Sequence, residues 1–390
     1  EIRLIGDSYD DAGIAAKQYC KEAGAVYVHP YDDLTTMAGQ GTLADEIVMS
    51  GEGPFDRVYV PIGGGGLAAA VGCWIKRFWP DCKVIGVEGE DQSSMKAAIA
   101  AGEPVELDYV DVFCDGTAVR KVGSNTFDIC NEVLDEIVAV SNDEVCHGIR
   151  RLWETIRAIP EPSGAMAIAA IAQDYAAGKI KEGEKVLSVI SGANMDFAQL
   201  ATISRRAGIG SRQRRFLRVP IPEGKGSLLE FLTALPEEVS IVDLQYGRVS
   251  GTAQYPVLGM IGSAEDYAKV DELLAQRGVV ASDVSTDEVV GYRIINYDAE
   301  QFNCPLFVNI EFPERAGAFQ QFMDKVSGLS SLCYFNYEYS GERVGRALVG
   351  MDFENQATKD SCEALLRKMV GGDIRDVRAV SNETLQRLLG

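Results

Sequence analysis

This chain is organised around the stretch Val58-Tyr59-Val60-Pro61-Ile62-Gly63-Gly64-Gly65-Gly66-Leu67. The apolar run at its start is typical of a buried β-strand, and Leu67–Phe78 has the apolar spacing of a helix. Because glycine lacks a Cβ, successive N–H groups of the four glycines can turn toward one anion at the positive end of that helix. The run therefore predicts a phosphate cradle, and no lysine or threonine follows to make it a nucleotide P-loop. A tight strand-to-helix turn without a ligand is the alternative.

The composition is that of a globular protein with a large core. The chain has 390 residues, of which 46% are hydrophobic and 24% are charged, and this length predicts two or three domains. The formal net charge of −21 argues against nucleic acid and anionic membrane surfaces as partners, because both repel an acidic protein. No run reaches the length of a membrane span, so no membrane partner is expected.

Cysteine and histidine usage argues against several kinds of catalytic site. The nine cysteines are scattered without a Cys-x-x-Cys pair, which is typical of reduced core residues in an intracellular, cytoplasmic protein. The two histidines, His29 and His147, are too few for a zinc site at normal spacing, and no metal is expected. They also give little support to Ser-His-Asp or Cys-His catalysis.

Residues 1–207 alternate between apolar strands and helices. This pattern predicts a parallel sheet with helices on both faces, whose ligands bind beyond the carboxyl ends of the strands. Two strand ends carry suitable loops, the glycine run and Ser191-Gly192-Ala193-Asn194. The predicted strands are Ile2–Ile5, Ala25–Val28, Arg57–Ile62, Lys83–Val87, Ile137–Val140 and Lys185–Ile190. The predicted helices include Tyr9–Ala23, Ser93–Ala101, Asp143–Arg157 and Ser163–Ala177.

A basic, glycine-containing stretch over residues 208–215 is interpreted as an interdomain linker, with an ordinary helix exit as the alternative. After it the sequence repeats with a constant offset of 91 residues, as between Tyr246 and Tyr337. A repeat of this length is a whole small domain, so we expect two modules, residues 216–302 and 303–390. The other matching pairs are Phe216 with Phe307, Pro222-Glu223 with Pro313-Glu314, Gly226 with Gly317, Phe231 with Phe322, and Gly259-Met260 with Gly350-Met351.

Each module has the order strand, helix, strand, strand, helix, strand, which is the ferredoxin-like pattern. Two such modules attached to an α/β domain indicate a sensor. In the second module the predicted elements are Leu306–Phe312, Gly317–Val326, Ser331–Tyr337, Gly345–Phe353, Lys359–Val370 and Ile374–Ala379.

Taken in order, the motifs of the chain resemble those of threonine dehydratase (threonine ammonia-lyase), a fold-type II enzyme that depends on pyridoxal phosphate. The resemblance covers essentially the whole chain. It implies a fold-type II, tryptophan synthase β-like α/β domain with a parallel sheet, incomplete at its N-terminus, followed by two ACT-like regulatory modules. Besides the glycine run, the matching motifs are His29-Pro30-Tyr31-Asp32-Asp33, Ala38-Gly39-Gln40-Gly41-Thr42, Gly86-Val87-Glu88-Gly89-Glu90-Asp91, Asp115-Gly116-Thr117-Ala118-Val119, Glu161-Pro162-Ser163-Gly164-Ala165, Ser191-Gly192-Ala193-Asn194 and the Phe-Pro-Glu-x-x-Gly signature at Phe312.

The resemblance implies roles for residues of the catalytic domain. Ser191 faces the pyridine nitrogen of pyridoxal 5'-phosphate, and a neutral hydroxyl there leaves that nitrogen unprotonated, which favours elimination. Gly116 and Glu161 line the pocket. As alternatives, Ser191 caps a helix that starts at Met195, and Glu161 is only a charge at a helix start. The backbone amides that hold the cofactor phosphate are those of Gly63, Gly64, Gly65, Gly66 and Leu67.

Part of the family pattern does not occur in residues 1–390. The family's Schiff-base lysine lies in a Ser-Phe-Lys-x-Arg-Gly-Ala-like stretch, and its substrate carboxylate is held by a Ser-x-Gly-Asn-His loop; neither stretch is present. Because the elimination needs that lysine as covalent anchor and as base, we expect this polypeptide alone to be inactive, without a catalytic residue of its own. By resemblance, the chain begins inside the smaller catalytic subdomain.

The regulatory half matches the family throughout. The resemblance places isoleucine and valine effector sites near Tyr246, Asn336 and Tyr337, at the ends of the second strands of the modules. A branched amino acid bound between paired modules would favour one of two packings and so regulate the catalytic half. The alternative is that both tyrosines are ordinary half-buried sheet residues, since aromatic residues favour strands.

Three functions follow from these patterns. The leading hypothesis is a biosynthetic threonine dehydratase of isoleucine biosynthesis, which deaminates L-threonine to 2-oxobutanoate and ammonia, with L-serine as secondary substrate. By resemblance it is a homotetramer when intact, cytoplasmic or, in a plant or alga, in the plastid. The second hypothesis is a non-catalytic regulatory protein that binds branched-chain amino acids. The third, a serine dehydratase or serine racemase, is disfavoured because those enzymes resemble only the catalytic half.

Overall fold

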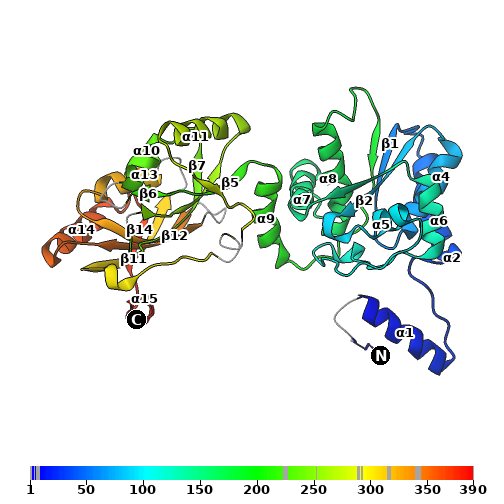
Figure 1. Ribbon diagram of the computed structural model, residues 1–390, viewed down its shortest axis with the longest axis horizontal. Helices are drawn as coiled ribbons and strands as arrows, with labels where there is room; N and C mark the ends of the chain where they lie inside the picture. Colours follow the sequence, from blue (N-terminus) through cyan, green and yellow to red (C-terminus); the bar gives the residue numbers. More distant parts are fainter. Residues whose placement is uncertain are drawn as a thin grey trace. The chain divides into compact units, whose positions relative to one another are not determined.

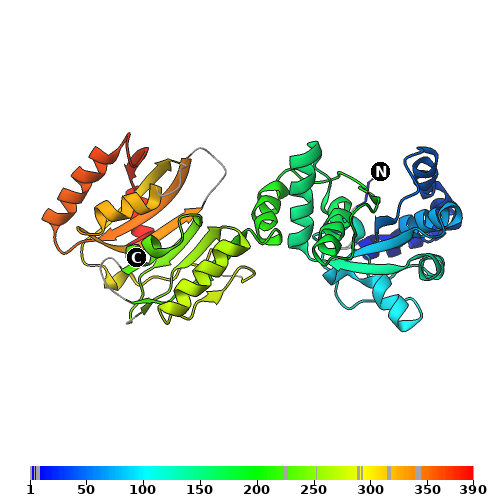
Figure 2. The same ribbon diagram turned by 90° about the horizontal axis from the view of Figure 1, so that it is seen from above.

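The computed structural model describes residues 2–3, 5, 9–222, 227–251, 253–287, 290, 293–313, 318–338 and 344–389 (Figures 1 and 2). The chain forms two compact units, Glu1–Ser211 and Arg212–Gly390. Residues 208–215, predicted as a linker, are largely regular structure, because α9 (Gln199–Gly210) contains the first of them and β5 (Arg214–Arg218) the last. Only residues 211–213 lie between these elements. No helix in the described ranges is long and apolar enough to cross a membrane.

Unit 1 is built around a parallel sheet that has four strands within its described residues, in the order β3-β2-β1-β4. Side chains alternate across the central strand: Val58 and Val60 belong to a core shared with α2, α3, α4 and α6, and Tyr59 to one shared with α7 and α8. The strands are β1 (Arg57–Pro61), β2 (Lys83–Gly89), β3 (Glu136–Val140) and β4 (Val186–Ser188). The α-helices are α1 (Tyr9–Ala23), α2 (Leu34–Gln40), α3 (Thr42–Met49), α4 (Gly66–Phe78), α5 (Ser94–Ala101), α6 (Ser124–Val133), α7 (Asn142–Ile156), α8 (Pro162–Ala176) and α9, with 3-10 turns η1 (Glu90–Gln92) and η2 (Asp115–Thr117). The predicted sheet covered by helices on both faces is therefore confirmed.

Two predicted strands are not found in the described residues. Ala25–Val28 is irregular, as are the described residues of Ile2–Ile5, and Leu4 lies outside the described residues. Ile2, Val26 and Val28 are 90%, 88% and 76% exposed. No strand of the described sheet pairs with either segment, and an apolar run becomes a strand only when a neighbour accepts its backbone hydrogen bonds.

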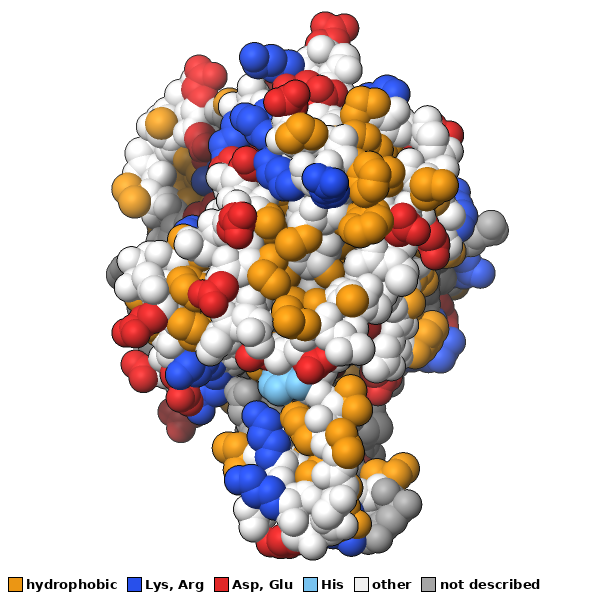
Figure 3. Space-filling view, turned by 90° about the vertical axis from the view of Figure 1, so that its right-hand side faces the viewer, with side chains coloured by type: hydrophobic (Ala, Val, Ile, Leu, Met, Phe, Trp, Pro, Cys, Tyr) orange, Lys and Arg blue, Asp and Glu red, His pale blue; other side chains and the backbone are white. Residues whose placement is uncertain are grey.

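Unit 1 also has an exposed apolar groove between α2, α3, α4 and α6. Figure 3, in which the right-hand side of Figure 1 faces the viewer, shows apolar side chains gathered on this face. The groove has a volume of about 520 Å³. Its largest lining side chains are Leu34, Met37, Trp74 and Ile129. Leu34 is 65% exposed and Trp74 37% exposed, so this apolar surface is open.

Unit 2 contains two ferredoxin-like modules in one antiparallel sheet. In the described residues the sheet has the strand order β10-β5-β9-β7-β12-β13-β11-β14. Counted from each outer edge of the sheet to its centre, each module contributes its fourth, first, third and second strands. The two second strands, β7 and β12, pair at the centre. We call this pair the seam. Module 1 consists of β5, β6 (Ile221–Pro222), α10 (Ser227–Ala234), β7 (Ser240–Gly247), β8 (Ala253–Gln254), β9 (Val257–Ile261), α11 (Ala264–Gln276) and β10 (Ser282–Asp283). Module 2 consists of β11 (Pro305–Pro313), α13 (Ala318–Val326), β12 (Ser331–Glu338), β13 (Val344–Asp352), α14 (Gln356–Met369), β14 (Asp376–Ala379) and α15 (Asn382–Leu389).

The repeated residues have repeated packing roles. In module 1 a Cβ on Gly259 would lie 2.7 Å from the ring of Phe216, and in module 2 a Cβ on Gly350 would lie 2.7 Å from the ring of Phe307. Each third strand thus carries a glycine that makes room for the phenylalanine of the first strand. Glu223, Gly226, Glu314 and Gly317, which belong to the predicted repeat, lie outside the described residues.

Candidate functional site

The glycine run joins the carboxyl end of β1 to the amino end of α4. Gly65 is the N-cap of α4 and has φ +93°, a left-handed conformation that favours glycine. A Cβ on Gly63 would lie 2.9 Å from the Cα of Thr117, and a Cβ on Gly64 would lie 2.3 Å from the ring of Tyr31. Only glycine therefore fits between these neighbours.

Three N–H groups of this run find no acceptor in the described part of the chain. Within the described residues, no atom accepts a hydrogen bond from the N–H of Gly63, Gly64 or Gly65, and Gly64 and Gly65 are buried. Buried N–H groups are nearly always paired, and leaving one unpaired costs about 1–3 kcal/mol. Consecutive free donors at the positive end of a 13-residue helix suit a phosphate group. The backbone of the run thus fits the predicted cradle.

The loop His29–Asp33 is tied to the glycine run. The carboxylate of Asp32 accepts the N–H groups of Asn125 at 2.9 Å and Thr126 at 3.2 Å, at the start of α6. The hydroxyl of Thr126 in turn donates to the carbonyl of Gly64 at 2.7 Å. Nδ1 of His29 accepts the N–H of Asp32 at 2.9 Å, and burial, followed by the charge of Lys17, lowers the pKa of this imidazole. His29 is therefore a loop-ordering residue.

A second wall of the site is formed by η2 and the start of α8. The hydroxyls of Thr117 and Ser163 are 3.2 Å apart and buried. A Cβ on Gly116 would lie 3.1 Å from Oε1 of Glu161 and 3.1 Å from the hydroxyl of Ser163. Since Thr117 also contacts Gly63, η2 connects the glycine run to α8.

The third segment is the loop after β4. Glu161 is the N-cap residue of α8, but its carboxylate makes no capping bond and instead accepts the N–H of Asn194 at 2.9 Å. The N–H of Glu161 donates to the carbonyl of Gly192 at 3.0 Å. Ser191 is exposed beside this contact. The alternative that Ser191 caps a helix starting at Met195 is wrong, because α9 begins at Gln199.

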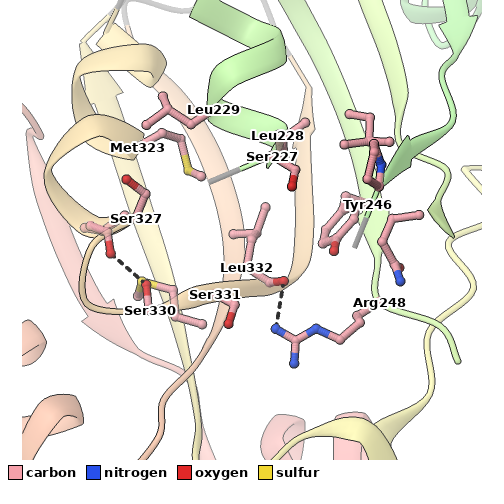
Figure 4. Close-up of a pocket in the computed structure, with 15 residues that line it drawn as sticks. Ser227, Leu228, Leu229, Tyr246, Arg248, Met323, Ser327, Ser330, Ser331 and Leu332 are labelled. Atoms are coloured by element: carbon pink, nitrogen blue, oxygen red, sulfur yellow. Dashed lines mark hydrogen bonds between the residues drawn. The ribbon is translucent and has the colours of Figure 1, made fainter. Parts of the chain in front are cut away.

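Tyr246 lies in a pocket of about 160 Å³ in unit 2 with both polar and apolar lining residues, which we call the Tyr246 pocket. Figure 4 shows the phenol of Tyr246 and the guanidinium of Arg248 on one side and two serines, Ser327 and Ser330, on the other. Arg248 is held by the carboxylate of Asp352 at 2.9 Å and the carbonyl of Leu332 at 3.2 Å. The other polar and apolar lining residues include Ser227, Leu228, Met323, Ser327, Ser330 and Ser331.

Tyr337 lies in a second pocket, of about 660 Å³, which we call the Tyr337 pocket. It is the repeat equivalent of the first, because Pro222, Leu228 and Tyr246 of one correspond to Pro313, Phe319 and Tyr337 of the other. Where the Tyr246 pocket has Ser327 and Ser330, the Tyr337 pocket has Pro236 and Val239 at the equivalent positions. The Tyr337 pocket is therefore more apolar.

Asn336 was predicted beside Tyr337 in the effector site, and the structure does not bring the two side chains together. Neighbouring residues of a strand point to opposite faces. Tyr337 packs with Phe312 on the face that carries α10 and α13, whereas the amide oxygen of Asn336 accepts from Nη2 of Arg293 at 2.6 Å on the other face. Asn336 is not a lining residue of the Tyr337 pocket.

Several residues of the site had no predicted role. Tyr31, Asp32, Thr117 and Ser163 all lie in motifs of the family pattern, but their roles depend on contacts between distant segments that one sequence does not reveal. Glu88, in a further motif, is fully buried and accepts the N–H of Met95 at 2.8 Å. Burial raises the pKa of Glu88 to about 7.

Known proteins match this chain along most of its length. Residues 1–192 match the family model described as pyridoxal-phosphate dependent enzyme, and residues 303–389 match the C-terminal regulatory domain of threonine dehydratase. The biosynthetic L-threonine dehydratase of Escherichia coli is 35% identical over 356 residues, which are 90% of this chain and 69% of that protein. The chain belongs to the threonine dehydratase family.

Other members of the threonine dehydratase family agree. The biosynthetic chloroplastic threonine dehydratase of Arabidopsis thaliana is 33% identical, over 92% of this chain and 61% of that protein. The processed form of threonine deaminase isoform 2 from Solanum lycopersicum superposes with a TM-score of 0.51 and 39% identity, over 53% of this chain and 60% of that one. These matches confirm the resemblance, the fold class and pyridoxal phosphate as the cofactor, and they support the dehydratase over the non-catalytic alternative.

Proposed function

We propose that this chain holds pyridoxal phosphate at the glycine run and serves the deamination of L-threonine to 2-oxobutanoate and ammonia, with L-serine as a secondary substrate. The observation that carries the proposal is the set of unpaired N–H groups at Gly63, Gly64 and Gly65. Isoleucine and valine act as effectors in unit 2, at the Tyr246 and Tyr337 pockets. The names of the matched relatives support the dehydratase function, and the match of residues 303–389 to a regulatory domain supports an effector role for unit 2.

Each segment of the site has a part in this function. The glycine run holds the phosphate, and the contacts of Glu161 with Gly192 and Asn194 fix the loop that presents Ser191 to the pyridine nitrogen. Bound pyridoxal phosphate withdraws electrons from the α-carbon of the amino acid, which makes its proton removable. Because residues 1–390 contain no counterpart of the family's lysine stretch, we expect these residues alone to bind the cofactor without forming 2-oxobutanoate.

The phosphate assignment is tested with two glycine variants. Gly65 and Gly102 both have positive φ, +93° and +79°, so alanine is strained at either position. A Cβ on Gly65 would meet Met95 at 2.6 Å, whereas nothing lies within 4 Å of a Cβ on Gly102. Equilibrium dialysis of pyridoxal phosphate should show at least tenfold weaker binding for Gly65→Ala and unchanged binding for Gly102→Ala. Equal affinities for wild type and Gly65→Ala would contradict the assignment.

Assembly belongs to the same proposal. The family resemblance supports a homotetramer, and sedimentation velocity of the purified chain measures its mass directly. A single species of one chain mass, about 42.2 kDa, at micromolar concentration would contradict a tetramer of residues 1–390.

A further inference from the structure

The seam between the two modules is a short strand pair with different residues on its two faces. Residues 243–247 of β7 pair with residues 334–338 of β12. Leu244, Tyr246 and Phe335 belong to the apolar core on the face that carries the effector pockets, and Tyr337 packs against it. On the reverse face lie the polar side chains of Asp243 and Asn336.

One arginine spans the reverse face of the seam. Arg293 comes from the segment that connects module 1 to module 2. Its guanidinium donates to the carboxylate of Asp243 on β7 and, through Nη2, to the amide oxygen of Asn336 on β12 at 2.6 Å. The same Nη2 donates to the carbonyl of Tyr337 at 3.0 Å. A single planar group thus joins the two modules and holds the backbone of a residue that lines the Tyr337 pocket.

This contact is well shielded from water. The side chain of Asp243 is 2% exposed and that of Arg293 is 20% exposed. Arg214 of β5 lies 3.7 Å from the same carboxylate. Removal of Arg293 is costly in such a place, because it leaves the buried carboxylate of Asp243 with the more distant charge of Arg214.

The connecting segment is also fastened at the other end of the seam. The N–H of Asp298 donates to the carbonyl of Arg248 at 2.8 Å, and the ring of Tyr297 packs edge-on against Tyr334, with centroids 5.4 Å apart. Figure 1 shows this segment in yellow, leading into β11. Arg248 itself lines the Tyr246 pocket and bonds to Asp352 of module 2. An arginine that links the two modules therefore lies beside each pocket, Arg248 at the Tyr246 pocket and Arg293 at the Tyr337 pocket.

We propose that Arg293 is the residue through which the Tyr337 pocket and the Tyr246 pocket influence each other. A ligand in the Tyr337 pocket that shifts the backbone of Tyr337 moves the carbonyl that Arg293 holds, and Arg293 transmits this shift to Asp243 and so along β7 to Tyr246. Arg293 lines neither pocket, so its replacement changes communication without removing a ligand contact. The inference rests on the proposed effector sites.

The test compares Arg293→Met with Arg215→Met. Arg215 is a matched control: it is 25% exposed and pairs with two carboxylates, Asp271 at 2.7 Å and Asp283 at 2.9 Å, both in module 1. The probe is isoleucine, titrated by calorimetry into the full chain. Tyr246→Ala and Tyr337→Ala each leave one working pocket, whose isoleucine affinity is measured while the other pocket is empty. The same pocket is then measured in the chain whose other pocket is occupied. The ratio of the two affinities is the coupling factor. Couplings between sites are typically 5–150-fold.

We expect a coupling factor of at least fivefold in wild type and in Arg215→Met, and less than twofold in Arg293→Met. Hydrogen exchange without ligand gives an independent reading: the amides of residues 243–247 and 334–338 should exchange at least tenfold faster in Arg293→Met, with the β11–β13 pair unchanged. Arg293→Lys, which keeps the charge but not the planar fork, replaces the methionine variant if that variant fails to fold and should show the same losses in smaller degree.

Unchanged coupling and unchanged exchange in Arg293→Met would overturn the proposal. If wild type binds no isoleucine, the effector sites are wrong and the communication role falls with them. Faster exchange at the seam would still show in that case, so failure of the effector assignment is distinguishable from failure of the clamp itself.

Discussion

Asp32 and Asp33 are neighbours in the chain, and each carboxylate accepts backbone N–H groups at the start of a helix. Asp33 accepts those of Thr35 and Thr36 at the start of α2, and Asp32 those of Asn125 and Thr126 at the start of α6. Among the contacts of the described residues, only that of Asp32 continues to the glycine run, through the hydroxyl of Thr126. Asp32 and Asp33 thus make the same kind of capping contact, but Asp32 is the one that helps to position the glycine run.

Replacement of each aspartate by alanine separates stability from binding. Loss of a capping carboxylate costs about 1 kcal/mol, so both variants should be less stable to urea by about that amount. Asp32→Ala should in addition bind pyridoxal phosphate several-fold more weakly, because the carbonyl of Gly64 loses its ordered partner. Equal cofactor affinities in Asp32→Ala and Asp33→Ala, measured by equilibrium dialysis, would show that the tether does not position the run.

Glu88 makes the stability of the chain depend on pH. Burial raises its pKa to about 7 from the ordinary carboxyl value of 4.5, so between these two values the folded chain binds more protons than the unfolded chain. The free energy of unfolding therefore falls as pH rises through this window, by up to about 3 kcal/mol, and is level above pH 7. Urea unfolding of wild type and Glu88→Gln at pH 5 and pH 8 isolates the effect. The variant should gain stability relative to wild type at pH 8, and a pH-independent difference would disprove the linkage.

Residue roles were predictable where one segment suffices. The glycine run could be read alone, because strand, glycines and helix start are contiguous. Strand alternation predicts that Asn336 and Tyr337 lie on opposite faces of the sheet. The family resemblance alone does not predict this. Tyr31 and Thr117 could not be assigned from sequence, because their roles depend on contact with glycines more than 30 residues away.

At the scale of elements, the 91-residue repeat explains why the same packing contact occurs in both modules. Gly259 and Gly350 occupy equivalent places, and each makes room for an equivalent phenylalanine. The central strands β1 and β2 of the parallel sheet were predictable because both of their faces are buried. Ile2–Ile5 and Ala25–Val28 were wrongly predicted because a local pattern does not say whether a partner strand is present.

The paired glycines give a matched prediction. Gly259→Ala and Gly350→Ala should each destabilise unit 2 by about 1–3 kcal/mol, because the new methyl group forces the phenylalanine ring out of place. Gly328→Ala is the matched control, because its Cβ would meet nothing within 4 Å and its φ, like those of Gly259 and Gly350, is not positive. Urea unfolding followed by circular dichroism measures all three. If either repeat glycine tolerates alanine without loss, the packing role assigned to that copy is incorrect.

At the scale of the whole molecule, the chain joins a site for a phosphate-bearing cofactor in unit 1 to a pair of related pockets in unit 2. The division into a catalytic and a regulatory part was predictable from the change of pattern after residue 207, and the module order from the repeat. The seam was not predictable, since sequence does not show which edges of two small sheets pair. The domain limits 1–207, 216–302 and 303–390 remain predictions.

Calorimetric titration of isoleucine into the purified chain tests the central claim most directly, with valine as comparison and an assay for 2-oxobutanoate alongside. We predict saturable binding of isoleucine without turnover of threonine, and loss of part of the binding in Tyr246→Ala and of another part in Tyr337→Ala. Turnover would contradict the expectation that the lysine stretch is required. Absence of binding by the folded wild-type chain would contradict the regulatory assignment.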